Sequence, residues 1–337
     1  MRRNRQLLIA LALFLLTSVS ATGYGAIIEK TLEFPDPQVV ESEGGVLVNI
    51  EGLPVFGNPG EPLLPVYGLR VLLPQGEDVA AITIDLQGEK TISLADKIEC
   101  AQHQYPLSIE GPWQEVMPDE TIYGSAAPFP SQRVRHITTE TFRGYNFAFF
   151  TVYPVVYIGA ESKISFARRI TIRIETTPSA RLLRRSLGTL RASATDRRIV
   201  SRLVDDPSLI DSYSQGLVGP TLSTLVDPQE TYKYVIITNS TLEPVFEDLK
   251  ELKDKQGLRA RIVRLGEISA NYTGSDIQEK VRKFIRDAYL NWETEYVLLG
   301  GDDEIIPHRG FYAEASSYTC LLYTSDAADE GLGVDLG

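Results

Sequence analysis

Alternating and aromatic runs of apolar residues dominate the first half of the chain. Residues 82–86 alternate apolar and polar side chains, which is typical of a half-buried β-strand. Further runs rich in β-branched and aromatic residues lie at 44–50, 147–157 and 164–174, the last of which we interpret as a strand pair. Short strands separated by turns predict a β-rich sandwich domain over residues 22–179.

A different pattern begins near residue 230 and continues to residue 319. Short apolar runs at 234–238, 259–264 and 296–299 have the length and composition of buried strands. The segments between them have helical periodicity. Short connections between strand and helix predict right-handed crossovers, and therefore a parallel sheet layered by helices.

The two predicted helices of this section have definite faces and ends. The first presents Val245, Phe246, Leu249 and Leu252 on one side, and the second presents Ile277, Val281, Phe284, Ile285 and Ala288. Ser240 and Ser275 stand at capping-box spacing from Glu243 and Gln278. Gly257 offers a left-handed residue at the end of the first helix.

An arginine-rich segment separates these two sections, at residues 180–229. Seven arginines occur between residues 180 and 202, and Asp196 is the one acidic residue among them. The strand pattern fades, and Asp, Pro, Ser and Gly dominate residues 205–227. We interpret 180–229 as an exposed linker between domains, where proteases commonly cut.

The amino terminus has the three parts of a secretory signal peptide. Arg2, Arg3 and Arg5 precede an unbroken apolar run at residues 7–16, and small residues follow up to Ala21. Such a leader predicts export and removal of residues 1–21. The apolar run is too short for a stable membrane anchor, and no other stretch is suited to span a membrane.

Residues 320–337 differ in character from the rest. Residues 320–330 resemble the translation of a sequencing adapter, and 333–337 resemble its continuation. We therefore interpret 320–337 as a non-native tail and exclude it from the fold prediction. With Cys320 set aside, Cys100 is the one remaining cysteine, so no internal disulfide is expected.

Composition limits the classes of function. The chain has 337 residues, of which 43% are hydrophobic, which is typical of a globular protein. Its formal net charge of −12 would repel nucleic acid. Cys100 and His103 are close in sequence, but catalytic pairs usually meet across a fold. A small buried residue is the better interpretation of Cys100.

The order of motifs resembles a gingipain-type cysteine endopeptidase precursor. Residues 234–239, 252–257, 277–289 and 296–302 are similar to the start of that family's caspase-like catalytic domain, and 60–67 and 149–157 resemble its propeptide. The resemblance implies a secreted or cell-surface zymogen that hydrolyses protein or peptide substrates. It also implies a propeptide that contacts the active-site edge of its own catalytic domain and is released by cleavage.

The resemblance implies further site chemistry. In the family, a cysteine thiolate and a histidine carry out catalysis, and both lie downstream of the strand that ends at Gly301 and Asp302. His308 comes too early and lacks the following glycine, so we assign this chain no catalytic residue and expect it to be inactive. Asp302 stands where the family places a calcium-binding aspartate. An aspartate after two glycines also occurs as a simple loop cap, so both interpretations of Asp302 remain open.

Two other functions are compatible with parts of the sequence. Residues 300–304, Gly-Gly-Asp-Asp-Glu, resemble the signature of cyclic-dinucleotide synthases, but those enzymes place it on an antiparallel hairpin and act inside the cell. The second alternative is a non-catalytic secreted or cell-surface binding module with an α/β scaffold. A His-Gly pair and a later cysteine downstream would favour the peptidase.

Overall fold

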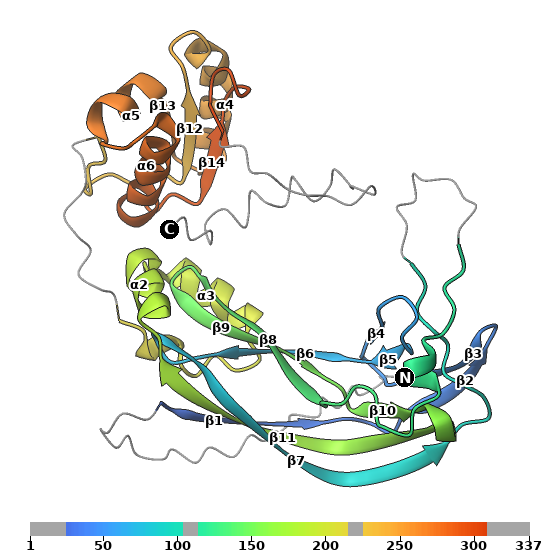
Figure 1. Cartoon of the computed structure of the whole chain (residues 1–337). Helices are drawn as coiled ribbons and strands as arrows, with labels where there is room; N and C mark the ends of the chain where they lie inside the picture. Colours follow the sequence, from blue (N-terminus) through green and yellow to red (C-terminus); the bar gives the residue numbers. More distant parts are fainter. Residues whose placement is uncertain (1–24, 104–113, 215–224, 309–337) are drawn as a thin grey trace, which may run out of the picture.

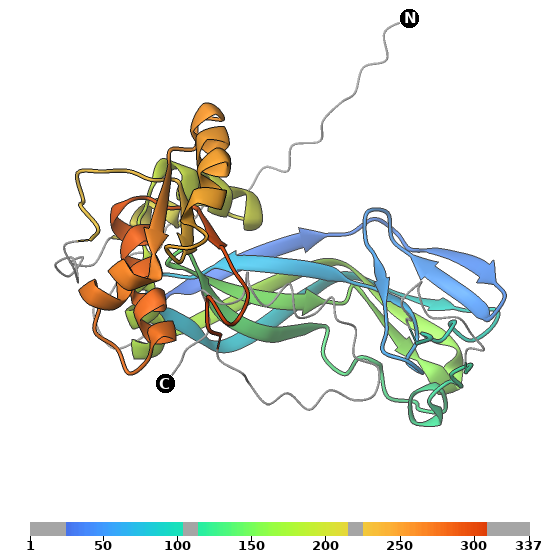
Figure 2. The same ribbon diagram turned by 90° about the horizontal axis from the view of Figure 1, so that it is seen from above.

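The computed structural model describes residues 25–103, 114–214 and 225–308, which form a long β-rich unit and a small α/β unit (Figure 1). Seen from above, the α/β unit lies over one end of the β-rich unit (Figure 2). The predicted signal peptide and tail, at 1–21 and 320–337, lie outside the described residues. Among the described residues, no helix is long and apolar enough to cross a membrane.

Two antiparallel sheets make up the first unit. In one sheet the long strand β11 (Lys163–Pro178) pairs with β7 (Glu77–Ser93) on one side, and with β1 (Ile27–Glu33) and β10 (Val155–Ile158) on the other. The other sheet has the order β6 (Tyr67–Leu72), β9 (Tyr145–Val152), β8 (Val134–Phe142). Smaller elements are β2 (Gln38–Ser42), β3 (Gly45–Asn49), β4 (Val55–Phe56), β5 (Leu64–Pro65) and α1 (Glu120–Tyr123).

Alternation along the strands builds the core between the sheets. The buried inward positions of β11 are Ile164, Phe166, Ile170, Ile172 and Ile174, and those of the other sheet include Leu69, Val71, Ala148, Phe150 and Val152. The sandwich prediction is therefore confirmed. The expected strand pair at 164–174 was wrong: β11 is one strand of 16 residues, because no turn residue interrupts its β-branched run.

Up to residue 214, the arginine-rich segment is helical rather than the open linker that the sequence predicted. It forms α2 (Ala180–Thr189), α3 (Ala194–Leu203) and a 3-10 turn at Ile210–Ser212. The buried side chains that pack this segment on the outer face of the second sheet are Leu72, Tyr145, Phe147, Leu190, Val200, Val204, Ile210 and Tyr213. The arginines obscured this pattern in the sequence, because the few apolar residues that face the sheet are spread among them.

The second unit is the predicted parallel sheet. β12 (Tyr234–Thr238) lies between β13 (Ala260–Arg264) and β14 (Tyr296–Leu299), and both pairings are parallel. The helices are α4 (Glu243–Lys255), α5 (Leu265–Asn271) and α6 (Ile277–Asn291). The predicted face of α6 is confirmed, since Phe284 and Ala288 are fully buried beside Trp292. The fold class is thus a β-rich sandwich followed by an α/β section.

Helix ends and one helix face differ from prediction. Helix α4 has Leu242 as its N-cap, and the Asn239 side chain, not Ser240, accepts the hydrogen bond from the Leu242 amide. Val245 and Leu252 are exposed at 69% and 49%, so only Phe246 and Leu249 of the predicted face are partly buried.

The second helix start is shifted by one residue, and a further helix was missed. Asp276 caps α6 by accepting from the Glu279 amide, whereas the sequence suggested Ser275. Helix α5 was not predicted, because it has only seven residues and includes a glycine. Gly257 has the expected left-handed conformation, with φ of 81°.

Candidate functional site

The carboxyl ends of the three parallel strands meet at one edge of the α/β unit. There β12 ends at Thr238, β13 at Arg264 and β14 at Leu299. The Gly300 amide donates to the Ile237 carbonyl at 2.7 Å, and the buried Thr238 hydroxyl donates to the Gly300 carbonyl at 2.7 Å. These bonds hold the start of the 300–306 loop against the central strand. In sheets of this kind, ligands bind at the carboxyl edge.

A hollow of about 500 Å³ lies at this edge, beside the ends of β12 and β13. Asn239, Ser240, Arg264, Gly266, Glu267, Ala270 and Asn271 line it. Arg264 forms ion pairs with Glu267 at 3.4 Å and Glu243 at 3.8 Å. Burial opposes ionisation of Glu267, yet the backbone amide and guanidinium of Arg264 hold the pKa of that carboxyl below its usual value. The two charged side chains in the lining, Arg264 and Glu267, therefore neutralise each other.

Asp302 lies in the exposed loop that follows β14. Its carboxylate accepts from the Glu304 amide at 3.2 Å, and its carbonyl accepts from the amides of Ile305 and Ile306. Gly301 precedes it with φ of 149°, where a Cβ would lie 2.6 Å from Ile305 Cγ2. The loop-cap interpretation of Asp302 therefore has direct contacts in its favour.

The described residues supply only some of the oxygen ligands that a calcium ion at Asp302 would need. Calcium takes about six to eight oxygen ligands. Asp303 and Glu304 add carboxylates next to Asp302, but no group of three or more His, Cys, Asp or Glu side chains in the described ranges is arranged to hold a metal. These residues do not by themselves fit a calcium site.

The other candidate residues lie away from this edge. Cys100 is buried in the sandwich unit, where its sulfur lies 3.3 Å from both the Val116 carbonyl and the Gln102 side-chain amide. Its expected structural character is confirmed. His103 is exposed. His308 is also exposed in a loop, and its carbonyl accepts from the Gln278 side chain, as expected for a surface histidine.

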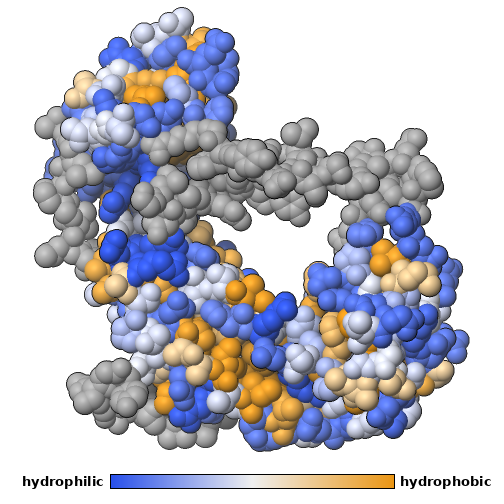
Figure 3. Space-filling model, viewed as in Figure 1, coloured by the Kyte–Doolittle hydropathy of each residue, from blue (hydrophilic) through white to orange (hydrophobic). Residues whose placement is uncertain are grey.

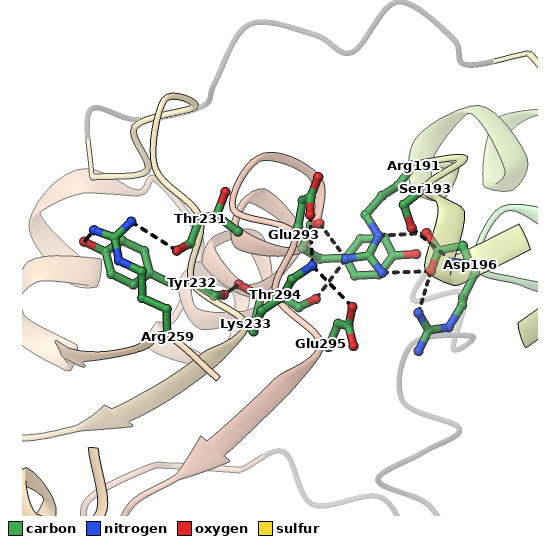
Figure 4. A network of polar contacts seen from close by, with 12 residues as sticks. Arg191, Ser193, Asp196, Thr231, Tyr232, Lys233, Arg259, Glu293, Thr294 and Glu295 are labelled. Atoms are coloured by element: carbon green, nitrogen blue, oxygen red, sulfur yellow. Dashed lines mark hydrogen bonds and ion pairs between the residues drawn. The ribbon is translucent and has the colours of Figure 1, made fainter. Parts of the chain in front are cut away.

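A polar network connects the two units at the opposite edge of the sheet (Figure 4). Arg191, which lies between α2 and α3, donates to the Thr294 carbonyl at 3.1 Å and to the Tyr289 carbonyl at 3.3 Å. Both carbonyls belong to the end of α6 and its turn into β14. The one signal for this site in the sequence is Asp196, the single acidic residue among the arginines of 180–202.

This contact differs from the expected position of the first unit. The resemblance implied that it covers the carboxyl edge of the sheet. Because helices in such folds run antiparallel to their strands, the end of α6 lies at the amino edge instead. Within the described residues, the Arg191 contacts therefore lie at the edge opposite Asp302.

A second hollow, of about 690 Å³, lies in the sandwich unit between β7 and the start of β8. Its lining includes Ile82, Ile84, Arg133 and His136, and apolar surface is exposed over the sandwich (Figure 3). Arg133 donates to the Pro154 carbonyl at 2.8 Å and to the Ser165 hydroxyl at 2.8 Å. We interpret Arg133 as a structural tie between strands, since these partners occupy its guanidinium.

Comparison with known proteins identifies the family. A profile of the C25 propeptide, Propeptide_C25, matches residues 18–195, more than half of the chain. A profile of peptidase family C25 matches residues 227–333. The chain belongs to peptidase family C25. It is a gingipain-type cysteine peptidase precursor, with the propeptide ahead of the peptidase section. The peptidase match includes part of 320–337, so the non-native origin of that segment remains a prediction.

Two solved structures of proteins from Porphyromonas gingivalis are distantly similar. One concerns the zymogenic latency of gingipain K; it is 19% identical, covers 45% of this chain and 88% of that chain, and has a TM-score of 0.37. The other is the complex of the RgpB pro- and mature domains; it is 12% identical, covers 54% and 93%, and has a TM-score of 0.42. No curated protein sequence matches the chain.

Proposed function

We propose that this C25 precursor belongs to a secreted or cell-surface cysteine endopeptidase, which hydrolyses protein or peptide substrates. The observation that carries the proposal is the order of the two family matches, propeptide at 18–195 and peptidase at 227–333, on one chain. The catalytic cysteine and histidine lie outside the described residues. The sandwich acts as the propeptide of the α/β section.

The chain as printed has no peptidase activity under this proposal. Cys100 is the one cysteine among the described residues, and it is buried in the propeptide. Incubation with chromogenic peptides that contain Arg or Lys should give background rates, unchanged by Cys100→Ser. Turnover that depends on Cys100 would contradict this assignment.

The peptidase assignment is tested on the gene itself. The chain is extended through its genomic sequence beyond Tyr318 and assayed with the same peptides. We expect a His-Gly pair and a later cysteine there, and activity that is lost when that cysteine is replaced. An extension without these residues would favour the non-catalytic binding module.

Export rests on residues 1–21. Fused to a phosphatase that lacks its own leader, this segment should direct the enzyme out of the cytoplasm, with cleavage after Ala21. Leu11→Arg interrupts the apolar run and should abolish export. Equal export by both fusions would contradict the leader.

Calcium is a separate proposal that rests on the family resemblance of Asp302. The metal would stabilise the carboxyl edge of the sheet by cross-linking its loops, with further oxygen ligands from outside the described residues. It takes no part in the proposed catalytic chemistry.

A further inference from the structure

Arg191 is held in place by the propeptide before it reaches the α/β unit. Its Nε and Nη2 donate to the two oxygens of Asp196 at 3.0 Å and 2.8 Å, a bidentate pair. Arg143, from the hairpin between β8 and β9, donates to the same carboxylate. Asp196 is fully buried and the Arg191 side chain is only 4% exposed. Two arginines thus share one buried carboxylate.

The remaining guanidinium nitrogen of Arg191, Nη1, points at the end of α6. The carbonyl of Tyr289 is among the last four of α6, which have no partner within the helix. Arg191 Nη1 supplies that partner, and it also donates to the carbonyl of Thr294. The guanidinium lies 4.0 Å from the centre of the Tyr289 ring. A cation is favoured at this place, because a helix carries partial negative charge at its carboxyl end.

The orientation of this helix end is itself fixed. The amides of Trp292 and Thr294 both donate to the Ala288 carbonyl, and the Thr294 hydroxyl donates to the Tyr232 carbonyl. Lys233 pairs with Glu293 at 2.9 Å and with Glu295 at 3.4 Å. The end of α6 therefore presents a rigid pair of carbonyls to Arg191. On the propeptide side, Gly188 faces the Arg286 side chain of α6, and a Cβ there would lie 3.2 Å from Arg286 Nη2.

We propose that Arg191 is the residue by which the propeptide holds the peptidase section, with Asp196 and Arg143 as its positioning residues. The surface it recognises is the carboxyl end of α6 in the same chain. Docking therefore takes place at the amino edge of the sheet and depends on one buried ion triad. This proposal rests on the proposed role of the sandwich as a propeptide. Its test uses no peptidase assay, so the docking role of Arg191 and the peptidase function can be refuted independently.

Small-angle scattering and amide hydrogen exchange on the full chain test the proposal. Arg191→Ala should release the α/β unit and increase the radius of gyration. Exchange of the Trp292 and Thr294 amides should rise about ten- to a hundredfold, because two hydrogen bonds from a charged donor are lost. Arg191→Lys should give an intermediate result, since an ammonium cannot hold Asp196 by a fork while reaching both carbonyls.

A matched control and a variant on the partner side keep the test specific. Arg198 lies exposed on α3, so Arg198→Ala should leave both measurements unchanged. Tyr289→Leu removes the ring beneath the guanidinium without altering the propeptide, and should also increase separation.

Three results would overturn the proposal. The first is a wild-type scattering profile and exchange rate in Arg191→Ala. The second is an equal effect of Arg198→Ala. The third combines two observations: faster amide exchange throughout β9 and β11 in Arg191→Ala, and an unchanged scattering profile in Tyr289→Leu. Together they would mean that Arg191 only stabilises the propeptide itself.

Discussion

The hydroxyl of Tyr213 donates to the carbonyl of Leu73 at 2.5 Å, across 140 residues of sequence. The same oxygen accepts from the Asn146 amide at 3.0 Å. Tyr213 thus bridges the residue that follows β6 and a residue of β9, and its ring lies 4.7 Å from that of Tyr145. The described part of the arginine-rich segment is therefore fastened to the sandwich at its far end as well as through α2 and α3.

Tyr213→Phe should destabilise the propeptide by about 1–3 kcal/mol, because it leaves a buried amide and a buried carbonyl without their partner. Chemical denaturation followed by circular dichroism measures the change. Tyr67→Phe is the matched control, since the Tyr67 hydroxyl bonds Asp205 in an exposed position. A loss no larger than that of the control would show that water replaces the Tyr213 bonds.

Trypsin should cut residues 181–202 slowly, and not at the rate of an open linker. A protease needs an extended stretch of chain, and α2 and α3 are helices with a buried face. Val200→Ala should accelerate cutting by opening that face, whereas Ser201→Ala, at an exposed position on the same helix, should not. Immediate cleavage of the wild-type chain at Arg184 or Arg198 would support the original linker interpretation.

The spacing of apolar residues predicted those parts of the fold in which a strand-like or helix-like spacing continues over a long segment. The sandwich strands and α6 have apolar residues at regular spacing, so their faces could be assigned from sequence. Helices α2 and α3 bury few apolar residues among many arginines, and their partner surface comes from β6 and β9, far away in sequence. The pattern of residues within a helix therefore does not reveal which distant strands that helix packs against.

The candidate site was predictable to a similar degree. The strand prediction placed Asp302 at the carboxyl edge of the sheet, because parallel strands end together. It did not single out Thr238 or Arg264. The hollow beside Arg264 depends on α5, which is too short to show a period. The Arg191 contact depends on how the two units meet, which no segment of either unit specifies alone.

Glu279 should titrate far below an ordinary glutamate. The Lys283 ammonium, 2.7 Å away, and the amide and hydroxyl of Ser275 lower the pKa of Glu279 to about 2. Its contribution to stability is therefore fully present above the unfolded pKa of 4.5 and is lost as the pH falls toward about 2. Carbon-13 NMR of the side chain should give this midpoint. An ordinary midpoint near 4.5 would mean that the first turn of α6 is frayed.

Calcium should raise the melting temperature only if Asp302 contributes to a metal site. We expect Asp302→Asn to abolish any such increase in the chain extended beyond Tyr318, and Asp248→Asn, on the exposed face of α4, to leave it intact. Differential scanning fluorimetry with calcium or a chelator measures this. An equal increase in wild type and Asp302→Asn would assign Asp302 to the loop-cap role alone.

Strand β14 should be the surface through which the described α/β unit associates with other chains. It is an edge strand of its three-stranded sheet, and Tyr296, Val297 and Leu299 are exposed at 51%, 37% and 50%. Exposed apolar edge strands pair readily with other strands, and a lysine on the edge opposes such pairing. Leu299→Lys should therefore slow aggregation measured by light scattering, while stability changes by no more than about 0.5 kcal/mol.

The control for this prediction is Val245→Lys, which adds the same charge at an exposed position on helix α4 rather than on a strand. If net charge alone governs association, both variants should slow aggregation equally, and the role of the β14 edge would be wrong. If backbone pairing at the edge governs it, Leu299→Lys should have the larger effect. The difference between the two variants therefore separates edge pairing from general electrostatic repulsion.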